Sequence, residues 1–456
     1  MIEKASSVKP FLLKCIIQSM EGGNMFISRW IRSFGSCKKS AGLMISALAL
    51  SLALVPDFPA EARVGLHQNY ELQKVVIFSR HNLRSPMATD SEKRKNLTPH
   101  QWQDSQIPPG YLSNRGGLVE TMMGESVKDE LTRENFMMSP KDWEGKASYF
   151  YADSDQRTIA TARYFAAGAA PEANIRVHHK MEGTKDPAFD TKLPDTLDRN
   201  TLSAVREGED IWIRSFLSAN KEEMNSDFRE LEKILDIYSS PDAQKGDFKG
   251  FVPEDLQITM KSGEKPKMKG SLKTAHSLAD SLLIRYYETE DDREAAFGHT
   301  TTFEDWKKIG RIKDDFGILL YGEPQAARYM AMPLVRMMER EMKNSRKFSF
   351  ICGHDSNMTA ILSALGTYPY ELPKSLEGRV PFGVKLVIEK WRGTDGILYG
   401  SACLLYPASR DIRHITVPRE DVTPLRYPLT FHGISQNEDG MMKWADLEKL
   451  FHQAIL

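Results

Sequence analysis

Residues 75–86 read VVIFSRHNLRSP, and this stretch decides the fold prediction. The apolar, partly β-branched run Val75–Phe78 predicts a short strand that is buried on both faces. Arg80, His81 and Arg84 follow this run directly. Buried cations need partners, so two guanidiniums around one imidazole are poorly suited to a protein core. They suit a bound phosphate, because guanidinium N–H groups match the geometry of an oxyanion.

His81 is the candidate nucleophile of this stretch. Neighbouring positive charge disfavours an imidazolium ion, so Arg80 and Arg84 favour the neutral ring. A neutral histidine can attack phosphorus and form a covalent phosphoenzyme. From these residues alone, the alternative is a surface loop that holds one histidine and two solvated arginines.

A second polar motif, GHDSN at 353–357, follows the apolar run 347–352, which we predict to be another strand. We expect Ser356 or Asn357 to cap a helix over 358–365, because short polar side chains satisfy the first N–H groups of a helix. The sequence therefore predicts a second strand end that carries a His-Asp pair.

The two motifs together resemble those of the histidine acid phosphatases, a family that includes bacterial phytases and periplasmic glucose-1-phosphatases. RHNLRSP is similar to the family signature RHGxRxP, and His354-Asp355 matches the pair that the family carries after a late strand. The resemblance runs from about Tyr70 to the C-terminus, with the motifs in family order. Asn82 departs from the signature, because most members have glycine there, and RHN is the form of the glucose-1-phosphatase branch.

The resemblance implies an α/β fold, with a central mixed sheet flanked by helices and an inserted, mostly α-helical domain. The composition supports such an insertion, because residues 184–323 are charged and helix-favouring with few strand signals. We therefore expect residues 63–183 and 324–456 to form the two parts of the α/β core. The helical insertion is expected to form a lid beside them.

Two further residues are assigned through the resemblance. Arg157 is expected in the first turn of a helix after a strand over Ala147–Tyr151, where it matches a third phosphate ligand of the family. Glu288 ends an amphipathic helix over Ser271–Tyr287, and a similar glutamate in the glucose-1-phosphatase branch is linked to the selection of a sugar phosphate. For Glu288 the alternative is an ordinary helix-end carboxylate at a solvated surface.

The implied reaction is the hydrolysis of a phosphomonoester in two displacements. His81 attacks phosphorus, and Asp355 protonates the leaving oxygen and then helps to activate water. The non-bridging oxygens are bound by four side chains: Arg80, Arg84, Arg157 and His354. Because guanidiniums neutralise the charge of the phosphoryl group, the mechanism requires no metal and no cofactor. It requires Asp355 and His81 to be neutral together, which predicts an acidic pH optimum.

Sugar phosphates such as glucose 1-phosphate are the expected substrates. Asn82 adds bulk where the family has glycine, and we expect it to narrow the site against inositol hexakisphosphate. Phytase specificity remains the alternative. Two other classes are a phosphomutase of the same superfamily and a phosphate-binding protein without turnover.

The first 62 residues predict a secretory signal peptide. Four Lys or Arg side chains between positions 29 and 39 precede the apolar stretch 41–55, and Ala60-Glu61-Ala62 forms an A-x-A cleavage site. Met25 would give this leader an ordinary length. The mature chain is expected to begin near Arg63, to lie in the periplasm and to have no stable membrane insertion.

Net charge and cysteine content give two further predictions, one on nucleic-acid binding and one on disulfide bonds. A formal net charge of −1 over 456 residues gives no indication of nucleic-acid binding. Cys352 and Cys403 lie in apolar strand-like runs, so we expect two free buried thiols, with a disulfide as the alternative. These patterns carry no prediction of oligomeric state.

Overall fold

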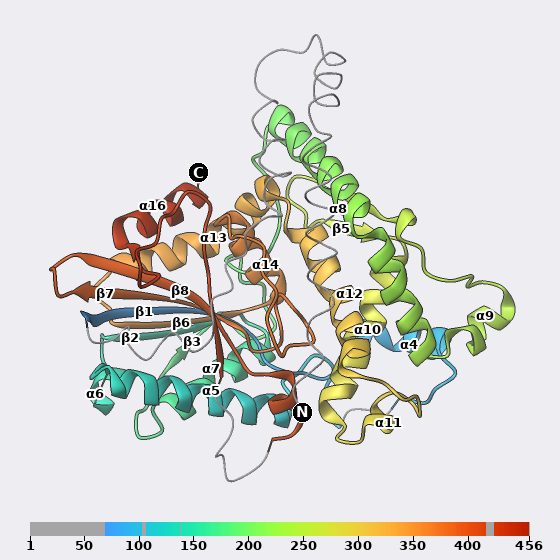
Figure 1. The fold of residues 1–456 in the computed structure, drawn as a ribbon, viewed down its shortest axis with the longest axis horizontal. Coiled ribbons are helices and arrows are strands. Elements are labelled where there is room, and N and C mark those ends of the chain that lie inside the picture. Colours follow the sequence, from blue (N-terminus) through green and yellow to red (C-terminus); the bar gives the residue numbers. More distant parts are fainter. Residues whose placement is uncertain (1–68, 103–105, 138, 416–423, 456) are drawn as a thin grey trace, which may run out of the picture. The chain divides into compact units, whose positions relative to one another are not determined.

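The computed structural model describes residues 69–102, 106–137, 139–415 and 424–455 of the chain (Figure 1). The signal peptide predicted over residues 1–62 lies outside the described residues. One sheet dominates the fold, with strand order β10-β8-β7-β1-β6-β2-β3 and with β9 paired to β8. Its strands are β1 (Tyr70–Arg80), β2 (Ser148–Ala152), β3 (Val177–His178), β6 (Phe348–Gly353), β7 (Lys385–Gly393), β8 (Leu398–Tyr406), β9 (Leu425–Pro428) and β10 (Met442–Lys443).

The sheet is mixed, as the sequence analysis expected. Strand β6 pairs in parallel with β1 on one side and with β2 on the other, and β2 pairs in parallel with β3. Strands β7 and β8 form antiparallel ladders. The carboxyl ends of β1, β6 and β2 therefore meet at one edge, which is where open α/β sheets bind their ligands.

Helices cover both faces of the sheet (Figure 1). Val75 and Ile77 of β1 belong to the same core cluster as apolar residues of α5 (Asn114–Arg133) and α7 (Gln156–Ala169). Val76 and Phe78 point to the other face, toward α13 (Pro324–Lys343), α14 (Asp355–Ala364) and α16 (Trp444–Ile455). Because side chains alternate along a strand, the unbroken apolar run in β1 serves two cores at once.

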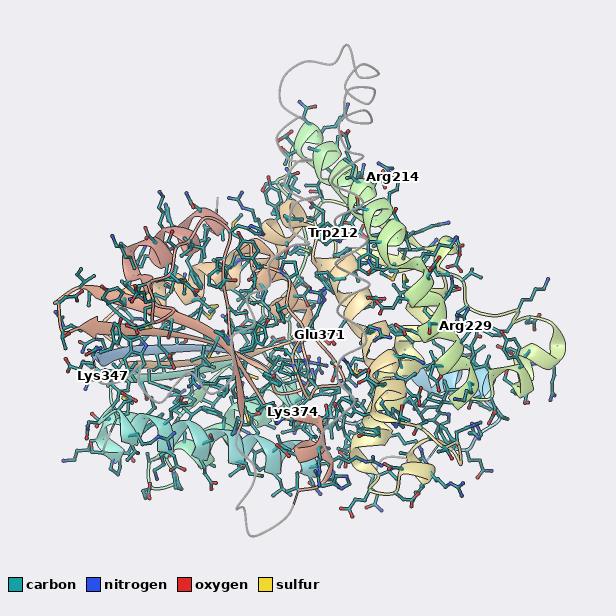
Figure 2. All side chains as sticks on the ribbon, viewed as in Figure 1. Trp212, Arg214, Arg229, Lys347, Glu371 and Lys374 are labelled. Atoms are coloured by element: carbon teal, nitrogen blue, oxygen red, sulfur yellow. The ribbon has the colours of Figure 1, made fainter. Side chains whose placement is uncertain are left out.

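The chain between β3 and α13 is mostly helical and includes one short hairpin. Trp212 lies between α8 and α12, where its Nε1–H donates to the Ile318 carbonyl at 3.1 Å (Figure 2). Arg214 and Arg229, also labelled there, are exposed on α8. The elements of this segment are α8 (Arg199–Ile234), α9 (Pro241–Lys245), β4 (Gln257–Thr259), β5 (Lys267–Lys269), α10 (Ser271–Glu288), α11 (Asp292–Ala295) and α12 (Phe303–Tyr321).

Shorter elements connect these parts: η3 (Ala88–Asp90), α4 (Ser91–Leu97), α6 (Pro140–Glu144), η4 (Ile237–Ser239), η5 (Pro253–Asp255) and α15 (Ser409–Arg413). Among the described residues, no helix is long and apolar enough to span a bilayer. Cys352 and Cys403 are both buried and are not joined in a disulfide, which confirms the predicted thiols. The domain boundaries at 183 and 323 stay predictions.

One local prediction was wrong. Helix α14 begins at Asp355 rather than at Met358, because His354 occupies the N-cap position. The side chain of Asn357 accepts a hydrogen bond from the His354 N–H at 3.0 Å, which closes the first turn earlier than a Ser356 or Asn357 cap would. The shift places Asp355 in the first turn of the helix.

Candidate active site

Three polar side chains meet at the carboxyl edge of the sheet. The His81 N–H donates to the Gly353 carbonyl, and the Asp153 N–H donates to the Cys352 carbonyl, both at 2.9 Å. The backbone hydrogen-bond ladder that joins β1, β6 and β2 thus continues by one residue beyond the strands. The rings of His81 and His354 approach with centroids 5.5 Å apart. Two motifs more than 270 positions apart therefore form one site.

A cavity of about 330 Å³ opens at this edge. The N-terminal turns of α7 and α14 reach it, and helix N-termini favour bound anions. Its lining consists of His81, Arg84, Met87, Asp153, Ser154, Asp155, Arg157, Thr184, Lys185, Asp186, Phe189, Asp190, Lys265, His354, Asp355 and Ser356.

His81 is held as a neutral ring with one nitrogen available. Its Nδ1 lies 2.8 Å from the backbone carbonyl of Asn82. A carbonyl oxygen can only accept, so Nδ1 carries the proton and Nε2 keeps its lone pair. Burial lowers the pKa of His81 well below its ordinary value, and the positive charge of Arg157 lowers it further. This is the state that an attacking histidine requires.

Arg80 lies behind the cavity rather than in its lining. Its guanidinium is 1% exposed, donates to Glu377 Oε1 at 3.0 Å and stacks on the Phe382 ring at 4.1 Å. Nη2 lies 3.3 Å from the Asp355 carboxylate. Nε and Nη2 are buried and make no hydrogen bond with any described residue, and of these two only Nη2 has an ion-pair partner, so Nε is the donor left to bind an oxyanion.

Arg84 and Arg157 reach the cavity itself. Arg84 Nη2 is held by the Asp280 carboxylate at 2.9 Å. Arg157 Nη2 pairs with Asp155 at 2.6 Å, and its Nε is a second buried donor without a hydrogen bond in the described part of the chain. The structure therefore brings Arg84 and Arg157 together beside His81.

His354 is oriented by a carboxylate that the sequence analysis did not single out. Its Nε2 donates to Asp153 Oδ2 at 2.6 Å, and Arg157 Nη2 lies 3.3 Å from Nδ1. Burial would raise the pKa of Asp153, but its hydrogen bond with His354 lowers it. The only sequence signal for Asp153 was its position two residues after the strand predicted over Ala147–Tyr151.

Asp355 faces the cavity as a half-exposed carboxylate, with its side chain 47% accessible. Burial would raise its pKa, but Arg80 and then Lys313 lower it well below the ordinary value. In the unliganded site this group is therefore ionised at moderately acidic pH. A phosphate dianion brought beside it raises its proton affinity.

Asn82 does not narrow the cavity, so that expectation is corrected. Its side chain is fully buried and points away from the lining, with Nδ2 donating to Glu120 Oε2 at 2.8 Å. Lys385 pairs with the other Glu120 oxygen at 2.8 Å, and neither side chain is exposed. The amide of Asn82 therefore joins a buried ion pair behind His81 and does not face the substrate.

Replacing Lys385 with methionine is expected to lower the free energy of unfolding by about 3–5 kcal/mol, because it leaves the Glu120 carboxylate buried without a countercharge. Urea unfolding of wild type and variant measures this loss. The double variant Glu120→Gln/Lys385→Met should be more stable than Lys385→Met alone. Lys390→Met, on the same strand, serves as the control. A loss below about 1 kcal/mol would show that the pair is not stabilised as described.

Glu288 is not brought into the cavity. It ends α10, is partly exposed and pairs with Arg115 Nε at 3.5 Å. The neighbouring Tyr287 is buried, and its hydroxyl bonds to Ser409 at 2.9 Å. The geometry matches the helix-end alternative better than a residue that contacts the substrate.

Asp153, Asp155 and His354 offer three donor atoms within 4.8 Å of one another. His354 already donates to Asp153, and Arg157 neutralises Asp155. Because these charges are matched by protein partners, the donor set does not fit a resident metal, and we assign no metal ligands here.

Sequence reasoning also missed the polar groups that segments far along the chain supply. The segment after β3 adds four charged residues to the lining, and Lys265 from the β4–β5 connection pairs with Asp190 at 3.0 Å. No motif marks them, because they meet only through the tertiary fold. These four residues are Lys185, Asp186, Asp190 and Lys265.

The fold and the site define an α/β enzyme that acts on phosphate esters. The model of the histidine phosphatase superfamily (branch 2) matches residues 71–415, so the chain belongs to this superfamily. It is therefore a phosphomonoester hydrolase whose substrates are small phosphorylated molecules.

Relatives within the superfamily include glucose-1-phosphatases and phytases. A glucose-1-phosphatase of Salmonella typhimurium is 32% identical over 329 residues, which are 71% of this chain and 78% of the relative. A glucose-1-phosphatase of Providencia rettgeri is 27% identical over 90% of this chain and 99% of its own. The solved phytase of Citrobacter braakii has a TM-score of 0.74 at 25% identity, over 85% of this chain and 98% of its own.

Proposed function

We propose that this protein hydrolyses sugar monophosphates such as glucose 1-phosphate through a phosphohistidine on His81. The observation that carries the proposal is the hydrogen bond from His81 Nδ1 to the Asn82 carbonyl, which leaves Nε2 unprotonated in the cavity. Arg84 and Arg157 line the same cavity and supply the positive charge that a phosphoryl group requires.

In the first step Nε2 of His81 forms a bond to phosphorus while the bond to the sugar oxygen breaks. Asp355, protonated when the dianion is bound, gives its proton to the departing oxygen. In the second step water attacks the phosphohistidine and gives a proton to the Asp355 carboxylate. The bond between Nε2 and phosphorus then breaks, and inorganic phosphate leaves.

The charge balance of the cavity supports a substrate with one phosphate. Four lining side chains are cationic and five are carboxylates: Arg84, Arg157, Lys185 and Lys265 against Asp153, Asp155, Asp186, Asp190 and Asp355. A hexakisphosphate would bring many more negative charges than these cations neutralise. Carboxylates around the rim are suited to sugar hydroxyls, which donate hydrogen bonds to them. Phytase activity is therefore the weaker alternative.

Initial rates with glucose 1-phosphate and inositol hexakisphosphate, with EDTA present, test the substrate class. We expect kcat/KM for the sugar phosphate to exceed that for phytate by at least about tenfold, because one phosphate fits the charge balance. A preference for phytate would keep the mechanism but contradict the substrate proposal. If phosphate binds but neither ester turns over, the non-catalytic alternative replaces it.

The same proposal places the protein in the periplasm. The support is the leader pattern, in which basic residues, an apolar stretch and an A-x-A site precede Arg63. Recovery of phosphatase activity in the periplasmic fraction, and its loss when residues 41–55 are deleted, is the expected result. Activity that stays with the cytoplasmic fraction of the intact cell would contradict this location.

A further inference from the structure

Charged side chains of alternating sign form a continuous chain from the cavity wall to Asp355. Arg84 Nη2 lies 2.9 Å from Asp280, and Lys313 Nζ lies 2.9 Å from the other oxygen of the same carboxylate. Lys313 Nζ is also 2.8 Å from Glu377 Oε1. We call this set of side chains the charge chain; its members, in order, are Arg84, Asp280, Lys313, Glu377, Arg80 and Asp355.

The second half of the charge chain reaches Asp355. The Glu377 oxygen that Lys313 contacts is also 3.0 Å from Arg80 Nη1, so one carboxylate oxygen joins two cations. Arg80 Nη2 then lies 3.3 Å from Asp355. Lys313 and Arg80 both stand over the ring of Phe382, at 4.3 and 4.1 Å from its centroid. The ring covers the two cations on one side and limits access of water to them.

The middle of the charge chain is buried, whereas Asp355 opens to the cavity. Asp280 and Lys313 are each 5% exposed, and Glu377 is 1% exposed. Charges that water does not screen influence one another strongly, so a change at one member alters the field at the next. Asp280 belongs to α10 and Lys313 to α12, so the helical segment supplies the centre of the charge chain.

We propose that Asp280, Lys313 and Glu377 are positioning residues of the active site, through which the helical segment holds Arg80 and Arg84 and controls the proton of Asp355. This inference rests on the proposed roles of Asp355 and the arginines. It gives the helical segment a part in the chemistry beyond covering the cavity. The residues act through their neighbours, since none of the three lines the cavity.

The field at Asp355 has contributions from several elements. The nearest cation is Arg80, and the charge of Lys313 acts on the carboxylate from α12. Other groups face it from β1, α7, α10, α12 and the end of β6, and the pair formed by Glu377 and Asp280 offsets the cations. Among the described residues, the groups whose charges act on Asp355 include Arg80, Arg157, His276, Lys313, Tyr321 and His354. Removing one member of the charge chain therefore changes the net electrostatic field at Asp355 but leaves the other contributions in place.

Two substitutions with opposite effects on the charge at Asp355 test the inference through pH profiles of kcat on glucose 1-phosphate, which report the complex in which the bound phosphate raises the proton affinity of Asp355. In Lys313→Met, Asp355 keeps its proton to higher pH, so the ratio of kcat at pH 7 to that at pH 4.5 should rise at least about threefold. In Glu377→Gln, Arg80 acts on Asp355 without an opposing carboxylate, so the same ratio should fall at least about threefold.

Conservative and remote variants provide the controls. Lys313→Arg keeps the positive charge and should retain the wild-type profile. Lys307→Met removes a lysine of the same helix that pairs with the exposed Glu371 at 2.6 Å, and should not move the profile (Figure 2). Thermal unfolding shows which variants are folded. If Lys313→Met does not fold, the test rests on Glu377→Gln, because glutamine has nearly the same shape as glutamate.

Shifts of opposite sign would support the inference, because loss of structure alone cannot produce them. The inference is overturned if both variants lower kcat by one factor at every pH, or if both shift the profile in the same direction. The result is separable from the proposed mechanism. If Asp355→Asn shows the loss of acid catalysis expected below while these shifts are absent, only the role of the charge chain fails.

Discussion

Replacing His81 with alanine is expected to lower kcat on glucose 1-phosphate by at least about 10⁴-fold, because the substitution removes the proposed nucleophile. The variant should also form no acid-labile phosphoprotein when it is mixed with labelled substrate and quenched. The guanidiniums remain, so inorganic phosphate should still bind with an affinity close to that of wild type. Initial rates, quench trapping and calorimetric titration with phosphate measure the three effects.

His179→Ala is the matched control for this experiment. His179 lies just after β3, is half-buried and stands outside the cavity lining, so its loss should leave kcat within about twofold. Residual activity of His81→Ala above about one per cent, or a phosphoprotein that still forms, would show that another group attacks phosphorus. Loss of phosphate binding together with activity would indicate a collapsed site instead.

Asp355→Asn is expected to separate substrates by their leaving groups. Hydrolysis of glucose 1-phosphate should fall by about 10²–10⁴-fold, because the departing sugar oxygen needs a proton. Hydrolysis of p-nitrophenyl phosphate should fall less than about tenfold, since its phenolate is stable without one. Initial rates on both substrates measure the difference.

The pH profile gives the same test a second readout. Arg80 and Lys313 hold the pKa of Asp355 well below its ordinary value in the free site, and a bound phosphate dianion raises it, so the protonated fraction in the complex falls between acidic and neutral pH. Burial keeps the pKa of His81 far below its ordinary value, so the nucleophile stays neutral in acid. We therefore expect wild-type kcat to decline from acidic toward neutral pH, and this decline to flatten in Asp355→Asn.

Asp190→Asn supplies a control among the lining carboxylates. Asp190 pairs with Lys265 at the cavity and has no place in the proton transfer. Its replacement should affect both substrates by a similar factor and keep the slope of the pH profile. An equal loss on both substrates in Asp355→Asn would remove Asp355 from the role of general acid.

Local patterns were sufficient to predict the central strand, the two histidine motifs and the helix that carries Arg157. The apolar run of β1 is unbroken because both faces of a central strand are covered, and this leaves a readable signal over a few residues. The His-Asp pair was readable because it stands directly after such a run. The mixed sheet followed from the resemblance, since pairing of distant strands leaves no local pattern.

The direction of single side chains was decided by tertiary packing. Asn82 is next to His81 in the sequence, yet its amide faces Glu120 because Lys385 brings a buried carboxylate to that side of the loop. Glu288 ends a correctly predicted helix, yet Arg115 from another helix holds it away from the lining. Spacing along the chain carries no information on such partners.

The sequence by itself determined the nucleophile motif, the late His-Asp pair and the class of chemistry that they support. Only the tertiary structure decided which charges surround them: Asp153 on His354, and Asp280, Lys313 and Glu377 behind the arginines. The physical reason is the distance along the sequence over which each feature is specified. A strand and its motif are specified by neighbouring residues, whereas the field at Asp355 includes charges from β1, α7, α10, α12, the end of β6 and the loop before β7, which meet only when the chain folds.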